Sequence, residues 1–165
     1  MKVRIGSKAK TFRTVSFDAG RNEVVLIEQR LLPHKFELFR CNDFHATATA
    51  ITDMVVRGAG AIGATAAYGF AQGLRAFKGR NFKKFEAHTE GVYRILANAR
   101  PTAVDPVNAM DAIRRKLVAA STIEGRQDIA LAEAEAFADE DVQHCRELGV
   151  HGIREFTNIK TVWVD

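Results

Sequence analysis

The sequence predicts an α+β fold in which a small antiparallel sheet is followed by a helical bundle, ending at the first strand of a further α/β domain. Residues 12–39 alternate short β-prone runs with turn residues, and apolar residues between 42 and 148 recur at helical spacing. The last apolar run, Thr161–Val164, is nearly continuous, as in a strand buried on both faces. We therefore assign residues 1–152 to one domain and 153–165 to the start of a second.

The predicted sheet begins with a hairpin. The β-prone runs Thr14–Phe17 and Val24–Ile27 flank the turn-rich segment Asp18–Asn22. Lys35–Phe39 alternates with period two and predicts a third strand, which gives an antiparallel sheet with one covered face.

Two helices are expected next. Asn42 and Asp43 form a capping signal before a helix that runs to about Val56. After a break, the small and apolar residues from Ala61 to Leu74 predict a second helix, and its alanines and glycines indicate burial on all sides.

A third helix, over 82–96, stops before Pro101, because proline lacks an N–H and crowds the residue before it. Asp105 is the expected N-cap of a fourth helix, with Pro106 at its first position.

Ser121, followed three residues later by Glu124, is a capping-box signature for a fifth helix. Its apolar stripe continues to Leu148, and Gly149 is expected to end it.

Composition excludes several classes of protein. The 24 lysines and arginines against 20 acidic residues are too small a surplus to indicate nucleic-acid binding, and the basic segments Lys2–Arg13 and Arg75–Lys84 lack interleaved aromatics. No apolar run is long enough to cross a membrane, and the first twelve residues lack the features of a secretory signal, so a cytoplasmic location is expected. Cys41 and Cys145 lie far apart without metal-ligand spacing, which predicts free thiols and no metal.

Gly58–Gly63 matches the G-x-G-x-x-G pattern of dinucleotide-binding folds. That pattern requires a preceding strand and an acidic residue about 20 positions later, whereas a helix precedes it here and position 83 is lysine. We therefore expect no cofactor. Two alternatives remain: the glycines pack helices together, or they open an anion site.

The anion site is supported by two arginines. Arg57 precedes the glycine-rich turn, whose helix opens with N–H groups that lack internal partners, and a guanidinium beside such groups suits a phosphate ester. Arg100 lies at another helix break, where Pro101 could fix its direction; the alternative is an ordinary surface arginine near a helix end.

Several segments resemble the methylthioribose-1-phosphate isomerases. The hallmark segment of that family resembles Asp53–Gly63 together with Ala66–Gly69, and its second hallmark is similar to Ala99–Val104. Asp18–Phe39 is similar to the opening strands of the family, and Gly149–Gly152 to the end of its long helix. The resemblance covers roughly 12–152.

The resemblance implies that Arg57, Gly58, Ala59 and Arg100 hold a sugar-phosphate substrate, which the family converts from an aldose 1-phosphate to a ketose 1-phosphate in methionine salvage. The catalytic cysteine and aspartate of the family lie in a second, Rossmann-like domain, so no catalytic residue is assigned to this chain. Gly60 stands where many family members have proline.

Three functional hypotheses follow from the resemblance. The first is the amino-terminal half of an isomerase, inactive without a complementary carboxy-terminal chain. The second is a non-catalytic module that binds a sugar phosphate or another protein, as in the related regulatory subunits of a translation initiation exchange factor, and the third is a truncated product without function. An exposed strand edge at residues 161–164 would favour pairing with that chain or formation of a homo-oligomer.

Overall fold

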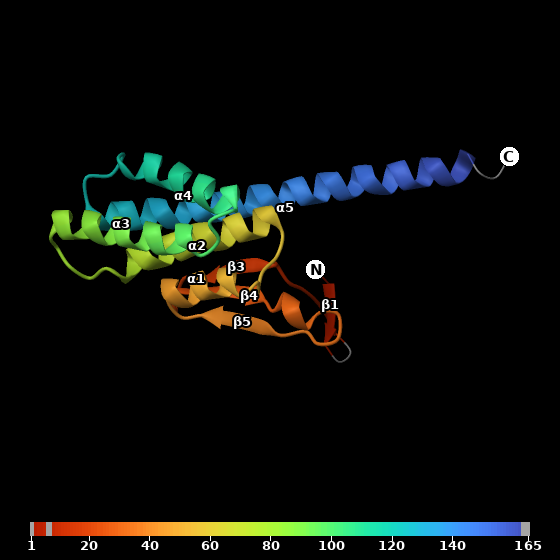
Figure 1. Ribbon diagram of the computed structural model, residues 1–165, viewed down its shortest axis with the longest axis horizontal. Helices are drawn as coiled ribbons and strands as arrows, with labels where there is room; N and C mark the ends of the chain where they lie inside the picture. The colour runs from red at the N-terminus through yellow and green to blue at the C-terminus, as the bar shows by residue number, and fades with distance from the viewer. Residues whose placement is uncertain (1, 6–7, 163–165) are drawn as a thin grey trace.

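The computed structural model describes residues 2–5 and 8–162, with side chains from 11 to 149. Three strands, β3 (Val15–Asp18), β4 (Glu23–Ile27) and β5 (Leu38–Cys41), form an antiparallel sheet in that order. Five helices follow: α1 (Phe44–Thr52), α2 (Ala59–Ala76), α3 (Phe82–Asn98), α4 (Val104–Leu117) and α5 (Ile123–Val162). The sheet lies along one side of the helical layer, and α5 projects beyond the bundle (Figure 1). The predicted sheet-and-bundle architecture is confirmed.

The hairpin is confirmed, with Val15 opposite Leu26 and Asp18 opposite Glu23. The third strand begins three residues later than expected. Residues 29–34 instead form the short 3₁₀ helix η1 (Gln29–Leu31) and a turn, after which the Lys35 amide donates to the Leu31 carbonyl at 2.9 Å. A period-two pattern cannot distinguish such a turn from a strand. A separate antiparallel pair, β1 (Lys2–Ile5) and β2 (Lys8–Thr11), was not predicted.

The caps of the helices match the sequence in part. Asp43 caps α1 as predicted, because its Oδ1 accepts from the Ala46 amide at 2.7 Å. The helix ends at Thr52 rather than near Val56, since Met54 adopts a left-handed φ of 59° and turns the chain.

Two predicted helix starts are shifted. Helix α4 begins at Val104 with Ala103 at the N-cap, so Asp105 and Pro106 lie inside the first turn, where proline costs no hydrogen bond. Helix α5 begins at Ile123, and the Thr122 hydroxyl, not that of Ser121, accepts from the Gly125 amide at 3.1 Å.

The predicted end of α5 was wrong. The helix continues past Gly149 to Val162, and a lone glycine costs a helix only about 1 kcal/mol relative to alanine. Thr161 and Val162 are therefore helical, and the expected strand Thr161–Val164 is not found among the described residues; Trp163 and Val164 lie outside them. A short apolar run is compatible with either element.

Helix α2 is the centre of the core, as its composition predicts. Every residue from Ile62 to Leu74 is buried, and α2 contacts the other four helices as well as β3 and β4. Gly69 and Gly73 allow the close approach, because a Cβ at Gly69 would lie 2.7 Å from Thr47 Cγ2 and one at Gly73 would lie 2.5 Å from Val92 Cγ1.

A buried amide joins α2 to the sheet. The Gln72 side chain is 1% exposed, and its Nε2 donates to the carbonyls of Asn22 and Cys41, each at 2.8 Å. Its Oε1 accepts from the Thr47 hydroxyl at 2.8 Å. All of these bonds form inside the core, so the amide fixes the sheet against α1 and α2 without leaving a buried group unsatisfied.

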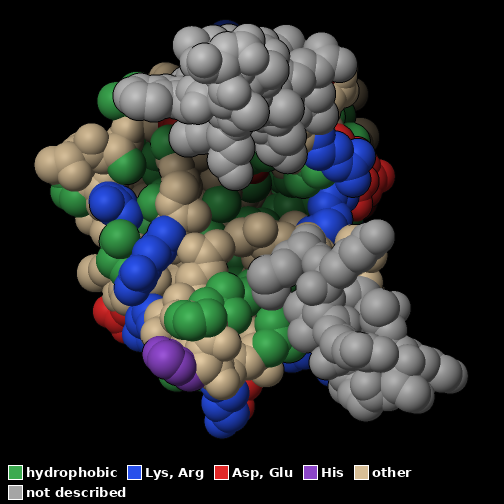
Figure 2. Space-filling model, turned by 90° about the vertical axis from the view of Figure 1, so that its right-hand side faces the viewer, with side chains coloured by type: hydrophobic (Ala, Val, Ile, Leu, Met, Phe, Trp, Pro, Cys, Tyr) green, Lys and Arg blue, Asp and Glu red, His purple; other side chains and the backbone are tan. Residues whose placement is uncertain are grey.

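The molecular surface shows no dominant basic face in the view of Figure 2. Lys and Arg side chains there form separate groups divided by hydrophobic and uncharged polar atoms. In the described part of the chain, no helix is long and apolar enough to cross a bilayer.

Substitutions at two glycines, one packed and one open, test the packing of α2. We expect Gly69→Ala to lower the free energy of unfolding by about 1–3 kcal/mol, because its methyl would overlap Thr47 Cγ2. The matched control is Gly91→Ala in α3, where a Cβ meets nothing within 4 Å; it should raise the free energy of unfolding by about 0.5–1 kcal/mol through helix propensity. Urea denaturation measures both, and equal effects would contradict the packing role of Gly69.

Candidate functional site

The loop between α1 and α2, residues 53–58, carries the predicted anion-binding residues. Arg57 and Gly58 are exposed at its end, and Ala59 is the first residue of α2. Gly58 has φ 95°, a left-handed conformation that favours glycine. This turn directs the chain into α2, so the backbone conformation alone accounts for the glycine at position 58.

The first turn of α2 presents unpaired donors. The Ile62 amide makes the first bond of the helix, to the Gly58 carbonyl at 2.9 Å, and Gly58 has no side chain with which to cap the helix. The amides of Ala59, Gly60 and Ala61 have no protein acceptor within the described residues. They are available to an anion, which the positive end of the helix dipole would also attract.

Helix η1 holds this loop in place. The Gln29 side-chain oxygen accepts from the Arg57 amide at 2.8 Å, and the Gln29 amide donates to the Val55 carbonyl at 3.0 Å. The Arg57 side chain forms no ion pair with a described residue. Its guanidinium is therefore available, whereas its backbone is fixed. The sequence did not indicate this role of Gln29.

A partly buried ion pair lies beside Gln29. Arg30 donates to the nearly buried Glu28 carboxylate through Nε at 2.8 Å and Nη2 at 2.6 Å. These hydrogen bonds lower the pKa of Glu28 against the opposing effect of burial, and the positive charge of Arg57 adds to the lowering. The Glu28 carboxylate is thus occupied by Arg30, and its interaction with Arg57 is through space without an ion pair.

Arg100 is brought to the same loop. The Thr52 hydroxyl donates to the Ala99 carbonyl at 2.9 Å, and Arg100 Nη1 lies 2.6 Å from Met54 Sδ. These contacts join the end of α3 to the loop that carries Arg57. The structure thus connects the two segments on which the sequence placed the anion site.

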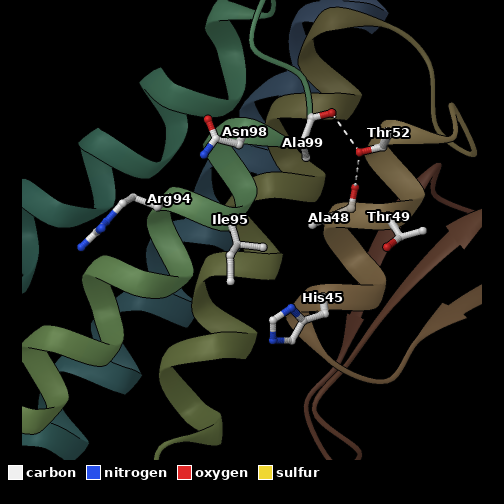
Figure 3. Close-up of a pocket in the computed structure, with 8 residues that line it drawn as sticks. All are labelled: His45, Ala48, Thr49, Thr52, Arg94, Ile95, Asn98 and Ala99. Carbon is white, nitrogen blue, oxygen red and sulfur yellow. Dashed lines mark hydrogen bonds between the residues drawn. The ribbon is translucent and has the colours of Figure 1, made fainter.

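An open groove of about 460 Å³ runs between α1 and α3 and ends at this junction. Figure 3 shows Thr49 and Thr52 on one wall, Ile95 on the other, and Ala99 at the end where the Thr52 hydroxyl bonds its carbonyl. Arg94, His45 and Asn98 also line the groove, so Arg94 adds a positive charge on the α3 side.

A carboxylate borders the first turn of α2. A Cβ built on Gly60 would overlap Asp141 Oδ1 of α5, so the glycine makes room for that side chain. Asp141, Asp105 and Glu140 line a neighbouring cavity of about 360 Å³ together with Phe137, His144 and Gly60. These carboxylates place negative charge beside the first turn of α2, and this charge opposes the binding of an anion there.

Three further predictions from the sequence concern the glycine string, the two cysteines and metal binding. The glycine string that matches a dinucleotide motif follows a helix, α1, rather than a strand, so its predicted structural context is confirmed. Burial raises the pKa of the Cys41 thiol to about 11, so it is protonated at neutral pH, and the exposed Cys145 lies on α5. The described residues contain no group of His, Cys, Asp and Glu that could hold a metal ion.

A protein family and several named proteins match this chain. Residues 55–164 match the initiation factor 2 subunit family. The chain is 41% identical over 150 residues to the methylthioribose-1-phosphate isomerase of Methylorubrum populi, covering 91% of this chain and 39% of that protein. It is also 41% identical over 143 residues to a putative methylthioribose-1-phosphate isomerase of Methanocaldococcus jannaschii, covering 87% of this chain and 39% of that protein.

Two crystal structures have the same fold. The 5-methylthioribose 1-phosphate isomerase of Pyrococcus horikoshii aligns with a TM-score of 0.76 at 36% identity, covering 81% of this chain and 37% of that one. The delta subunit of translation initiation factor eIF-2B from A. fulgidus aligns with a TM-score of 0.74 at 32% identity, covering 80% and 38%. The chain thus spans about two fifths of the length of the relatives it matches.

The contact between Asp141 and Gly60 predicts an electrostatic effect on anion binding. We expect Asp141→Asn to bind inorganic phosphate roughly three- to tenfold more tightly at low ionic strength, because it removes a like charge beside the free amides. Glu135→Gln is the matched control, since Glu135 is exposed on the same helix. Calorimetric titration measures both variants, and an unchanged affinity in Asp141→Asn would show that Asp141 does not face the anion.

Proposed function

The chain belongs to the initiation factor 2 subunit family, and we propose that it is the amino-terminal, phosphate-binding half of an aldose-ketose isomerase that acts on 5-methylthioribose 1-phosphate. The observation that carries the proposal is the start of α2, where the amides of Ala59, Gly60 and Ala61 have no acceptor among the described residues. Arg57 precedes this turn, and its side chain forms no ion pair with a described residue. Isomerases are the named relatives at 34–41% identity over most of this chain.

In this proposal the described half orients the substrate. The phosphoryl group would accept from the amides of Ala59, Gly60 and Ala61, and the guanidinium groups of Arg57 and Arg100 would neutralise its charge. An aldose 1-phosphate has no free aldehyde, because its anomeric carbon carries the phosphate. Its ring must therefore open before hydrogen moves from C2 to C1, and opening requires an acid near the ring oxygen.

The described half offers no suitable group for that step. Cys41 is a buried, protonated thiol, and the acidic cluster around Asp141 would repel the phosphate rather than bind it. We propose that a second, carboxy-terminal region supplies the acid and the base. A complementary carboxy-terminal chain would be the source, and the described half alone would be inactive.

The delta-subunit structure favours a second candidate function. Because that chain aligns at 32% identity with a TM-score of 0.74, the same half could serve a non-catalytic module that binds a sugar phosphate or another protein. Saturable binding of 5-methylthioribose 1-phosphate without turnover, in the presence of a complementary region, would favour this module over the isomerase.

The anion site is tested by Arg57→Ala. We expect affinity for 5-methylthioribose 1-phosphate to fall at least about tenfold, because a charge-assisted hydrogen bond to phosphate contributes roughly 1.5–3 kcal/mol. Arg115→Ala is the control, because Arg115 is exposed on α4 and its substitution removes the same charge away from the proposed site. Calorimetric titration of both variants gives the comparison. Equal affinities would place the phosphate elsewhere.

The division of labour is tested by activity. The 165-residue chain alone should not convert 5-methylthioribose 1-phosphate, and adding the carboxy-terminal region of a related isomerase should restore turnover that Arg57→Ala reduces. Phosphorus NMR follows the conversion of substrate to product. Turnover by the chain alone would show that the catalytic groups lie within it, and failure with every complementary region would contradict the isomerase proposal.

A further inference from the structure

A second cavity, of about 250 Å³, lies between α3, α4 and the start of α5. It is built from elements other than the loop that carries Arg57. Its lining includes two arginines, Arg114 and Arg126, two glutamates, Glu86 and Glu90, and the apolar side chain of Leu117. Cationic, anionic and apolar groups therefore meet around one small cavity.

Both arginines are held in place by aromatic rings. The Arg114 guanidinium carbon lies 4.4 Å from the centroid of the Tyr93 ring, and that of Arg126 lies 4.4 Å from the centroid of the Phe82 ring. A guanidinium stacked on a ring is pre-organised, so a ligand that bonds its remaining N–H groups orders less of the side chain.

The charges of the lining cancel. Arg114 Nη2 lies 2.9 Å from Glu90 Oε2, and Arg126 Nη1 lies 3.6 Å from Glu86 Oε1. A bare anion would be repelled by the two carboxylates and a bare cation by the two guanidinium groups. A ligand that carries both charges meets an opposite charge for each.

A hydroxyl in the same lining has no partner. Thr89 Oγ1 is buried and forms no hydrogen bond, and it is alone in this among the buried side-chain nitrogen and oxygen atoms of the described residues. Such a group lacks the hydrogen bond that nearly all buried polar atoms make. Rotation about χ1 would turn this hydroxyl toward the cavity that Thr89 lines, where a ligand carboxylate between the arginines could accept a bond from it.

We propose that this cavity binds a small zwitterion, namely a free α-amino acid with an apolar side chain. Its carboxylate accepts from Arg114, Arg126 and the Thr89 hydroxyl, and its ammonium group donates to Glu86 and Glu90. Its side chain packs on Leu117 and on Val118, which is 75% exposed at the rim. This site is independent of the phosphate site, so either can fail without the other.

L-Valine is the probe, and amide chemical shifts of the isotope-labelled 165-residue chain are the readout. We expect saturable shifts in residues 86–90, 114–118 and 126. Isovalerate lacks the ammonium group and isobutylamine lacks the carboxylate, so each should bind at least about tenfold more weakly. Absence of saturable shifts with millimolar L-valine, or equal binding of the three compounds, would overturn the proposal.

Variants identify the groups that bind. Arg126→Gln should weaken L-valine binding by about tenfold or more, and Thr89→Val, which keeps the shape of the side chain, by roughly three- to tenfold. Lys83→Gln is the matched control, because Lys83 is exposed on α3 and its loss changes the charge equally. If Arg126→Gln does not fold, Thr89→Val decides alone, and unchanged affinity in that variant would overturn the proposal.

Discussion

The complete burial of α2 is the constraint on which the rest of the structure depends. A helix that is surrounded on all sides cannot carry large residues where its neighbours cross, so glycine and alanine dominate between Ile62 and Leu74. The same crowding requires every polar group inside it to be satisfied, and Gln72 meets this requirement through bonds to Asn22, Cys41 and Thr47. Helix packing and the position of the sheet therefore have one common origin.

The candidate site follows from where that burial begins. Burial starts at Ile62, so the residues before it emerge at the surface with their amides unpaired, while the body of α2 is held rigidly by its neighbours. Gln29 and the contact between Thr52 and Ala99 fix the loop that leads into the helix. An anion would thus meet donors whose directions are set before it arrives, which lowers the entropic cost of binding.

Much of this could be predicted from sequence because the signals are local. The cap at Asp43, the hairpin around Asp18–Asn22 and the small-residue composition of α2 each lie within one element. The contact between Asp141 and Gly60 joins residues far apart in the chain, and no local pattern indicates it. The end of α5 was mispredicted for a different reason, since one glycine is too weak a signal to stop a long helix.

The charges around α2 argue for a division between binding and chemistry. Arg57 and Arg100 would favour a phosphate, and the Glu28 carboxylate near Arg57 already forms its ion pair with Arg30. Asp141 remains beside the first turn of α2, so an anion at the proposed site would bind against an electrostatic cost, because Gly60 lets that carboxylate approach. A ligand that carries hydroxyl groups as well as phosphate would reduce that cost, since a carboxylate accepts from a hydroxyl, and this favours a sugar phosphate over inorganic phosphate at the same position.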